Sequence, residues 1–171
     1  IESGYYTVKQ ITRDGVEETV LALTPKGLGL IGERAKQVVS FMKTEKGASV
    51  NLNTGPLTSK KGYVVSAFPE RTLIVPKGFE VTADHVRAFI QDNLDLLEEP
   101  DVLIGGWAEA ETGRTFLDLS LLLRDRRTAT AEAARRGEQA IFDVRRKRSV
   151  EIPRRRGLPH VGRLYERIQD L

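Results

Sequence analysis

The fold of the second half of this chain depends on residues 105–120, which read GGWAEAETGRTFLDLS. A polar segment containing glycine separates two strand-forming segments, and this pattern predicts a β-hairpin. Successive side chains of a strand point to opposite faces of a sheet. Leu117, Leu119, Leu121 and Leu123 therefore share one face of the second strand, and Phe116, Asp118, Ser120 and Leu122 share the other. We expect the leucine face to belong to the core and the other face to be of mixed character.

The segments around this hairpin predict the remaining elements of one α+β unit. Strand-forming residues occupy 63–68 and 72–75, and residues 82–97 keep a helical period between an N-cap at Thr82 and a stop at Pro100. A short helix over 128–136 should end at Gly137, before a strand over 140–144 that pairs with 149–152. The order β-β-α-β-β-α-β predicts an α+β fold with helices packed on one sheet.

The first 42 residues predict a smaller unit, a β-hairpin followed by a helix. Strand formers in 5–11 and 16–23 flank an Asp-Gly turn signal. Thr24 and Pro25 are typical of a helix start, and apolar residues continue at helical spacing to about residue 42. Glycines at 27, 29 and 32 weaken this helix and indicate that its early turns lie close to another backbone.

Residues 43–61 are polar, contain glycine and lack a period, so we interpret them as a linker or arm. The predicted domains are a hairpin-helix lobe at 1–42, the linker at 43–61, an α+β domain at 62–152 and a basic C-terminal arm at 153–171.

Positive charge concentrates at the end of the chain. Residues 145–171 contain nine Lys or Arg and three Asp or Glu, whereas the remainder contains 18 and 21. The predicted binding residues are Arg145, Arg146, Lys147, Arg148, Arg154, Arg155 and Arg156. Arginine suits phosphate oxygens, so nucleic acid is one expected partner. An acidic protein surface or a solvated extension is the alternative, because Tyr165 is the tail's single aromatic residue for base stacking.

Composition argues against several classes of site. The chain has no cysteine and two histidines, which excludes disulfides and thiolate metal sites, and we expect no metal and no cofactor. No apolar run approaches the roughly 20 residues of a membrane-spanning helix, and the amino end carries no export signal. We therefore expect no membrane partner.

Four residues are candidates for chemistry on one sheet face: Trp107, Asp118, Ser120 and Asp143. A carboxylate pair near an arginine would suit general acid and base catalysis. We favour the alternative, in which both aspartates end strands or bond to neighbouring loops, and we predict no catalytic residue.

Other conspicuous residues also receive structural interpretations. His85, in the first turn of a predicted helix, is expected to face solvent, and His160 lies in the basic tail. Gly105-Gly106 would allow a ligand or backbone to approach closely, but a β-bulge that bends the strand is the favoured interpretation.

Two stretches resemble known families. Residues 62–152 carry Gly62-Tyr63-Val64-Val65-Ser66, Gly105-Gly106-Trp107, Thr112-Gly113, Phe116-Leu117-Asp118-Leu119-Ser120 and Ala140-Ile141-Phe142-Asp143. On these motifs they resemble an uncharacterised module of actinobacterial phage and prophage proteins. Residues 4–35 are similar to the wing and following helix of winged-helix repressors and phage antirepressors, without the recognition helix that precedes the wing. The resemblance of residues 62–152 implies that the protein belongs to a phage or prophage setting, and it assigns no site residues.

These observations lead us to expect a non-enzymatic, virion-associated binding module. Its partners would be other phage structural proteins or DNA, its location the virion or host cytoplasm, and self-association is left open. One alternative is a DNA-binding phage regulator that uses the hairpin and basic tail. The other is an RNA-cleaving effector, which would need Asp118, Asp143, His85 or an arginine in a shared cleft.

Overall fold

The computed structural model describes residues 4–57 and 61–153. Its strands are β1 (Tyr6–Arg13), β2 (Val16–Leu23), β3 (Gly47–Asn51), β4 (Gly55–Pro56), β5 (Tyr63–Ala67), β6 (Leu73–Val75), β7 (Val102–Ala108), β8 (Thr115–Leu123), β9 (Ala140–Asp143) and β10 (Arg148–Glu151). Its helices are α1 (Pro25–Glu45), η1 (Pro69–Arg71), α2 (Ala83–Asp92), α3 (Leu94–Leu97) and α4 (Arg126–Arg135). The predicted α+β class is confirmed, as is the β-β-α-β-β-α-β order that begins at β5.

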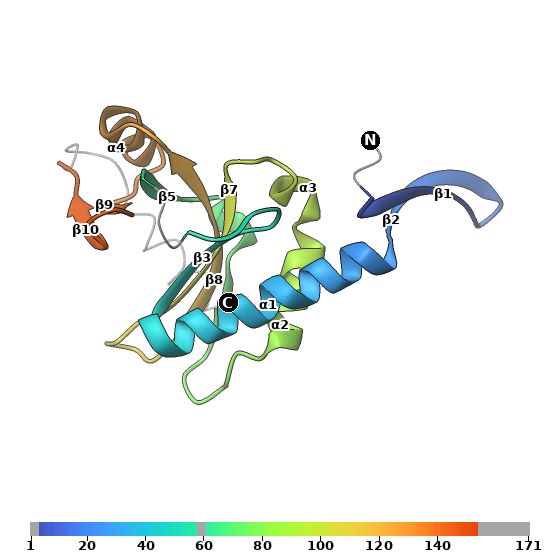
Figure 1. Ribbon diagram of the computed structural model, residues 1–171, viewed down its shortest axis with the longest axis horizontal. Helices are drawn as coiled ribbons and strands as arrows, with labels where there is room; N and C mark the ends of the chain where they lie inside the picture. The colour runs from blue at the N-terminus through green and yellow to red at the C-terminus, as the bar shows by residue number, and fades with distance from the viewer. Residues whose placement is uncertain (1–3, 58–60, 154–171) are drawn as a thin grey trace.

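One antiparallel sheet of eight strands organises the molecule (Figure 1). Its strand order is β10-β9-β5-β8-β7-β3-β4, and β6 also pairs with β8. The long hairpin β7–β8 lies at the centre, as the alternating pattern of residues 105–120 predicts. Strand β8 pairs with β7 along one edge and with β5 and then β6 along the other.

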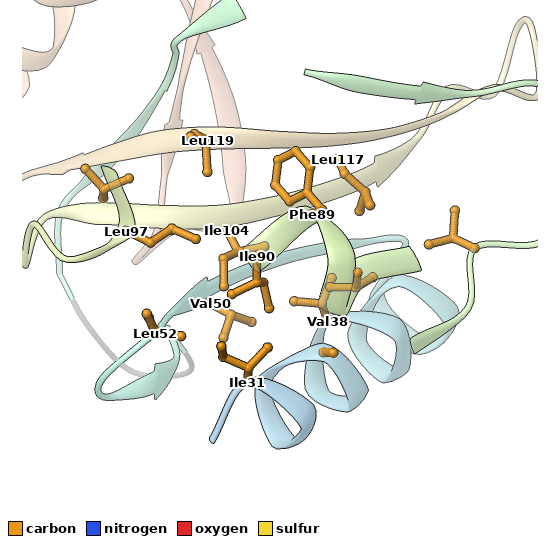
Figure 2. Packing of buried hydrophobic residues seen from close by; sticks show 14 residues of the cluster. Ile31, Val38, Val50, Leu52, Phe89, Ile90, Leu97, Ile104, Leu117 and Leu119 are labelled. Atoms are coloured by element: carbon orange, nitrogen blue, oxygen red, sulfur yellow. The ribbon is translucent and has the colours of Figure 1, made fainter. Parts of the chain in front are cut away.

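The helices cover one face of this sheet. Leu117 and Leu119 on β8 are fully buried against residues of α1 and α2 (Figure 2). At the other end of the sheet, Ala129 and Ala133 of α4 pack on Val65 of β5. Val65 lies opposite Leu121, so it shares the leucine face of β8, and α4 therefore covers the same side as α1 and α2. The expectation that the leucine face is core is confirmed.

Helix α1 begins where the sequence predicts. The Thr24 side chain accepts a hydrogen bond from the Gly27 amide at 3.1 Å, and Pro25 occupies the first turn, where its missing N–H costs nothing. A Cβ at Gly27 would lie 2.3 Å from the Tyr5 carbonyl oxygen, which confirms the close backbone approach at this glycine. The β1–β2 hairpin precedes the helix and extends away from the sheet (Figure 1).

The interpretation of residues 43–61 as a linker is wrong for the part that the structure describes. Residues 43–45 complete α1, and β3 follows as an interior strand between β7 and β4. Val50 and Leu52 are buried in the core cluster that also contains Ile31 of α1. Helix α1 therefore shares its core with the second half of the chain. The apolar residues at 50 and 52, with one polar residue between them, form a pattern too short to distinguish a buried strand from a loop.

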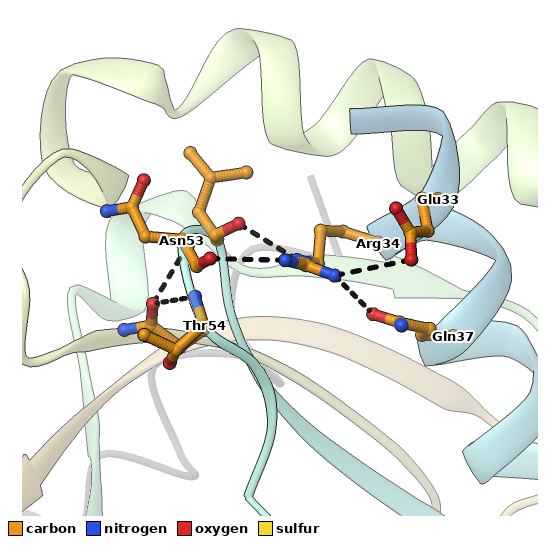
Figure 3. A network of polar contacts seen from close by, with 7 residues as sticks. Glu33, Arg34, Gln37, Asn53 and Thr54 are labelled. Atoms are coloured by element: carbon orange, nitrogen blue, oxygen red, sulfur yellow. Dashed lines mark hydrogen bonds and ion pairs between the residues drawn. The ribbon is translucent and has the colours of Figure 1, made fainter. Parts of the chain in front are cut away.

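A buried arginine fixes the turn between β3 and β4 (Figure 3). The Arg34 guanidinium on α1 donates to the Leu52 carbonyl at 2.9 Å and to the Asn53 carbonyl at 3.2 Å. Asn51 holds the same turn from inside, because its Oδ1 accepts from the amides of Asn53 and Thr54 at 2.9 and 3.0 Å. These bonds satisfy carbonyl and amide groups that the tight turn leaves without strand partners.

The helix expected over 82–97 forms, but it is interrupted. The Thr82 side chain caps α2 by accepting a hydrogen bond from the His85 amide, and His85 Nδ1 accepts one from the Thr82 amide at 3.1 Å. Asn93 then breaks the helix, because its buried amide side chain donates to the Phe89 carbonyl at 2.8 Å, and α3 starts after it. His85 is thus part of a helix cap.

Candidate functional site

The sheet face opposite the helices forms an open groove of about 1350 Å³. It runs across the strands from β3 and β4, over β7 and β8, to β5, β9 and β10. The charged residues that line it are Glu45, Lys46, Glu109, Arg114, Asp118, Glu138 and Lys147. Small-molecule sites usually measure roughly 300–1,000 Å³, so this groove has room for an extended ligand.

Asp118 lies on the floor of the groove, at a break in the strand pairing. Ala67, the last residue of β5, pairs with Leu119, and Leu73, the first residue of β6, pairs with Leu117. The five residues between the two strands leave the sheet next to Asp118. Phe68 turns the chain with a φ of 52°, a conformation that costs a residue with a Cβ roughly 1–3 kcal/mol.

The carboxyl group of Asp118 is buried and hydrogen-bonded. The side chains of Trp107, Ser120 and Ser66 hydrogen-bond to it, with Ser120 Oγ 3.5 Å from Oδ1. Burial removes water from the carboxylate and raises the pKa of Asp118 from 3.8 to about 6, although these three hydrogen bonds act in the opposite direction. A carboxyl group that exchanges its proton near pH 6 suits proton transfer near neutrality.

Gly105 makes room for this carboxyl group. It lies opposite Asp118 in the β7–β8 ladder, and a Cβ there would lie 1.9 Å from Asp118 Oδ1. On the core face, a Cβ at Gly106 would lie 2.6 Å from Met42 Sδ. The β7–β8 register continues without interruption through both glycines, so the predicted β-bulge is wrong. The glycines are needed because side chains from both faces fill the space of a Cβ.

An aromatic pair lies beside Asp118 on the groove face. Trp107 and Phe116 pair across the strands and stack with ring centroids 4.3 Å apart and 7° between the planes. Trp107 remains 40% exposed. Because Phe116 covers one side of the indole and Asp118 binds the ring through a hydrogen bond, the free part of Trp107 is a flat apolar surface in fixed orientation.

Glu138 brings a second carboxyl group to the groove. Helix α4 ends with Gly137 at a φ of 75°, and the amides of Gly137 and Glu138 bond to the carbonyls of Ala134 and Ala133 at 3.2 and 2.9 Å. This left-handed stop, which the sequence predicts, turns the next side chain toward the groove. Burial and the neighbouring charge of Asp118 raise the pKa of Glu138, while Arg136 lowers it.

Three of the four candidate residues come together, and the fourth does not. Trp107, Asp118 and Ser120 line the groove. Asp143 instead accepts the Arg146 amide and the Arg146 guanidinium, each at 3.0 Å, within the β9–β10 turn. Hydrogen bonds from this turn hold the pKa of Asp143 below its usual range. The expectation that each aspartate ends a strand or bonds to a neighbouring loop is therefore confirmed for Asp143, whereas Asp118 lies inside β8 and bonds to neighbouring strands. Glu138 was not predicted; its signal was a carboxylate directly after a glycine helix stop.

The first basic cluster belongs to a strand turn. Arg145, Arg146 and Lys147 form the turn between β9 and β10, and Arg148 starts β10. Lys147 lines the groove, and Arg146 is paired with Asp143. These four residues therefore lie within the α+β domain, before the arm expected at 153–171. The second cluster, Arg154, Arg155 and Arg156, lies outside the described residues, as does His160.

Within residues 4–57 and 61–153, no group of three or more potential ligands is arranged to hold a metal ion. Over the same residues, none of the helices is both long and apolar enough to cross a membrane. Comparison with known proteins found no matching family model, curated protein or solved structure.

Proposed function

We propose that the protein is an enzyme that binds an extended ligand in the groove and transfers protons to it through Asp118 and Glu138. The observation that carries this proposal is a buried carboxyl group on the floor of a large open groove, with a second carboxyl group, Glu138, close enough for the charge of Asp118 to raise its pKa. The causes of the raised Asp118 pKa include no basic partner among the described residues, so the group can hold and release a proton near neutrality.

The electrostatics of the pair give it a defined chemical use. Two carboxyl groups that repel each other when both are ionised lose their protons in two steps, so that one proton is held between them over an intermediate pH range. In that range one group acts as an acid and the other as a base. The groups that face Asp118 are Ser66 on β5, Trp107 on β7, Ser120 on β8 and Glu138 after α4. Glu138 is the charged member of that set.

The test is turnover of four substrate classes: a glycan, a peptide, a carboxylic ester and a phosphodiester. We expect one class to be converted, with loss of at least about 100-fold in rate in both D118N and E138Q, the usual contribution of general acid–base catalysis. The matched control is D92N, which changes an exposed aspartate of α2. If a substrate class were converted as fast by D118N and E138Q as by the wild type, the proposal would be contradicted.

A second candidate function is the virion-associated binding module expected from the sequence. It is favoured by the β1–β2 hairpin, which extends from the body of the molecule (Figure 1). Val8 and Leu21, which pair across this hairpin, are 60% and 64% exposed. Exposed apolar pairs on a two-stranded ribbon are typical of a surface covered by a partner. Incorporation into purified phage particles that is lost in a V8K/L21K variant would support this function, and unchanged incorporation would contradict it.

A further inference from the structure

The groove has three properties that define what it can bind. It is long, because it crosses the strands from Lys46 near β3 to Lys147 near β10. It has a flat aromatic surface, the exposed part of Trp107, fixed against Phe116. Two of the carboxyl groups that line it, Asp118 and Glu138, interact electrostatically. A ligand that uses all three is a polymer of rings joined by acid-labile bonds.

The charge of the groove separates the two common ring polymers. Among residues 4–57 and 61–153, three basic and four acidic ones line it. Nucleic acids bind in grooves with an excess of Lys and Arg, because the phosphate backbone supplies most of the binding energy. Of the three basic side chains, Arg114 is already paired with Glu109 at 3.0 Å. A balanced groove therefore fits an uncharged chain better than a polyanion.

From this we propose that the substrate is an uncharged glycan that lies across the strands with one sugar ring on Trp107, and that Asp118 and Glu138 hydrolyse its glycosidic bond. This inference rests on the function proposed above and adds the substrate class. A carboxyl pair is the usual machinery for glycoside hydrolysis, and an aromatic ring binds the apolar face of a sugar.

The chemical step requires water as the only co-reactant. The protonated carboxyl group gives its proton to the glycosidic oxygen while the bond from that oxygen to the anomeric carbon breaks, and the electron pair stays on the oxygen. A water oxygen forms the new bond to the anomeric carbon. The ionised carboxyl group takes one proton from that water. The products are two shorter sugars, and the pair again holds one proton.

The experiment has a binding arm and a cleavage arm. Cellohexaose, xylohexaose, maltohexaose and chitohexaose are titrated by calorimetry into the wild-type protein, W107A and F79A, with single-stranded DNA as the competing polymer. F79A is the matched control, because Phe79 is 69% exposed and does not line the groove. Release of reducing ends is then measured for wild type, D118N, E138Q and E111Q, in which Glu111 is an exposed carboxylate of the β7–β8 turn.

We expect at least one of the four oligosaccharides to bind, with affinity at least 10-fold weaker in W107A and unchanged in F79A. We expect its cleavage to be lost in D118N and E138Q and retained in E111Q. Circular dichroism of each variant separates loss of function from loss of fold.

The outcomes that overturn the inference differ from those that overturn the proposed function. Binding of DNA in preference to every oligosaccharide, or sugar binding without cleavage, would overturn the glycan inference. Turnover of an ester, peptide or phosphodiester that requires Asp118 and Glu138 would also overturn it, while the proposed acid–base function would stand.

Discussion

The replacement of Asp118 by asparagine should make the protein more stable near neutral pH and not in acid. Burial raises the pKa of Asp118 from 3.8 to about 6. A difference of one unit corresponds to about 1.4 kcal/mol, so the ionised carboxylate costs the folded state about 3 kcal/mol. Asparagine has the same shape and does not ionise, and it therefore avoids this cost.

The direction with pH follows from the sign of the shift. At a pH below 3.8, Asp118 is protonated in both the folded and the unfolded chain and costs nothing. As pH rises toward 6, the unfolded chain ionises first, and the folded state loses stability relative to it. Above pH 6 the loss of stability has reached its full value and no longer changes with pH. The free energy of unfolding of D118N minus that of wild type should therefore increase by about 3 kcal/mol between acid and neutral pH.

Urea unfolding at a series of pH values measures this difference, with the single tryptophan, Trp107, as the fluorescent probe and circular dichroism as the control. Other titrating groups are common to both proteins and cancel in the subtraction, apart from Glu138, whose pKa depends on Asp118. Repeating the comparison in an E138Q background separates that contribution. A difference between D118N and wild type that stays within about 0.5 kcal/mol from acid to neutral pH would refute the buried carboxylate argument.

Three further changes test the packing that supports the site. G105A should destabilise the protein by roughly 1–3 kcal/mol, because its Cβ would lie 1.9 Å from Asp118 Oδ1. The control G29A should be neutral or stabilising, because Gly29 on α1 has open space around it. Equal effects of the two variants in thermal unfolding would contradict the argument. N51A should lower the free energy of unfolding in urea by roughly 2–3 kcal/mol, because Asn51 donates to the Pro100 carbonyl at 2.8 Å and accepts hydrogen bonds from two amides of the turn. A decrease under about 0.5 kcal/mol would show that water replaces these bonds. R34M should lower the free energy of unfolding by roughly 1–3 kcal/mol and increase amide exchange at residues 52–54, because the Leu52 and Asn53 carbonyls lose the guanidinium. Unaltered exchange there would mean that the turn holds its shape without Arg34.

The central part of the fold was predictable because its signals are local and periodic. The alternation of Leu117 and Leu119 with Asp118 and Ser120 assigned the two faces of β8. Each helix end depends on a few neighbouring residues. The stop at Gly137 and the caps at Thr24 and Thr82 all form where the sequence predicts them. Such signals are read correctly because backbone hydrogen bonds at helix ends are satisfied locally.

The site was only partly predictable, because burial depends on strand order. Whether Asp118 ends as a solvated surface group or a buried acid depends on β5 and β6 pairing with β8 on either side of it, and on Gly105 lying opposite. Pro69 is a local signal for the break between β5 and β6, but the register that places Asp118 at this break and opposite Gly105 has no local signal in the sequence. Similarly, β3 is buried by its neighbours β7 and α1, and its own short apolar pattern did not distinguish it from a linker.

The most direct test of the account is a titration of the two carboxyl groups by carbon-13 NMR. We predict that the Asp118 carboxyl carbon titrates with a midpoint near 6 and that D118N lowers the midpoint of Glu138, because the variant removes the neighbouring negative charge. An Asp118 midpoint near the ordinary 3.8, or a Glu138 midpoint that D118N leaves unchanged, would contradict the claim that the groove holds a coupled acid–base pair.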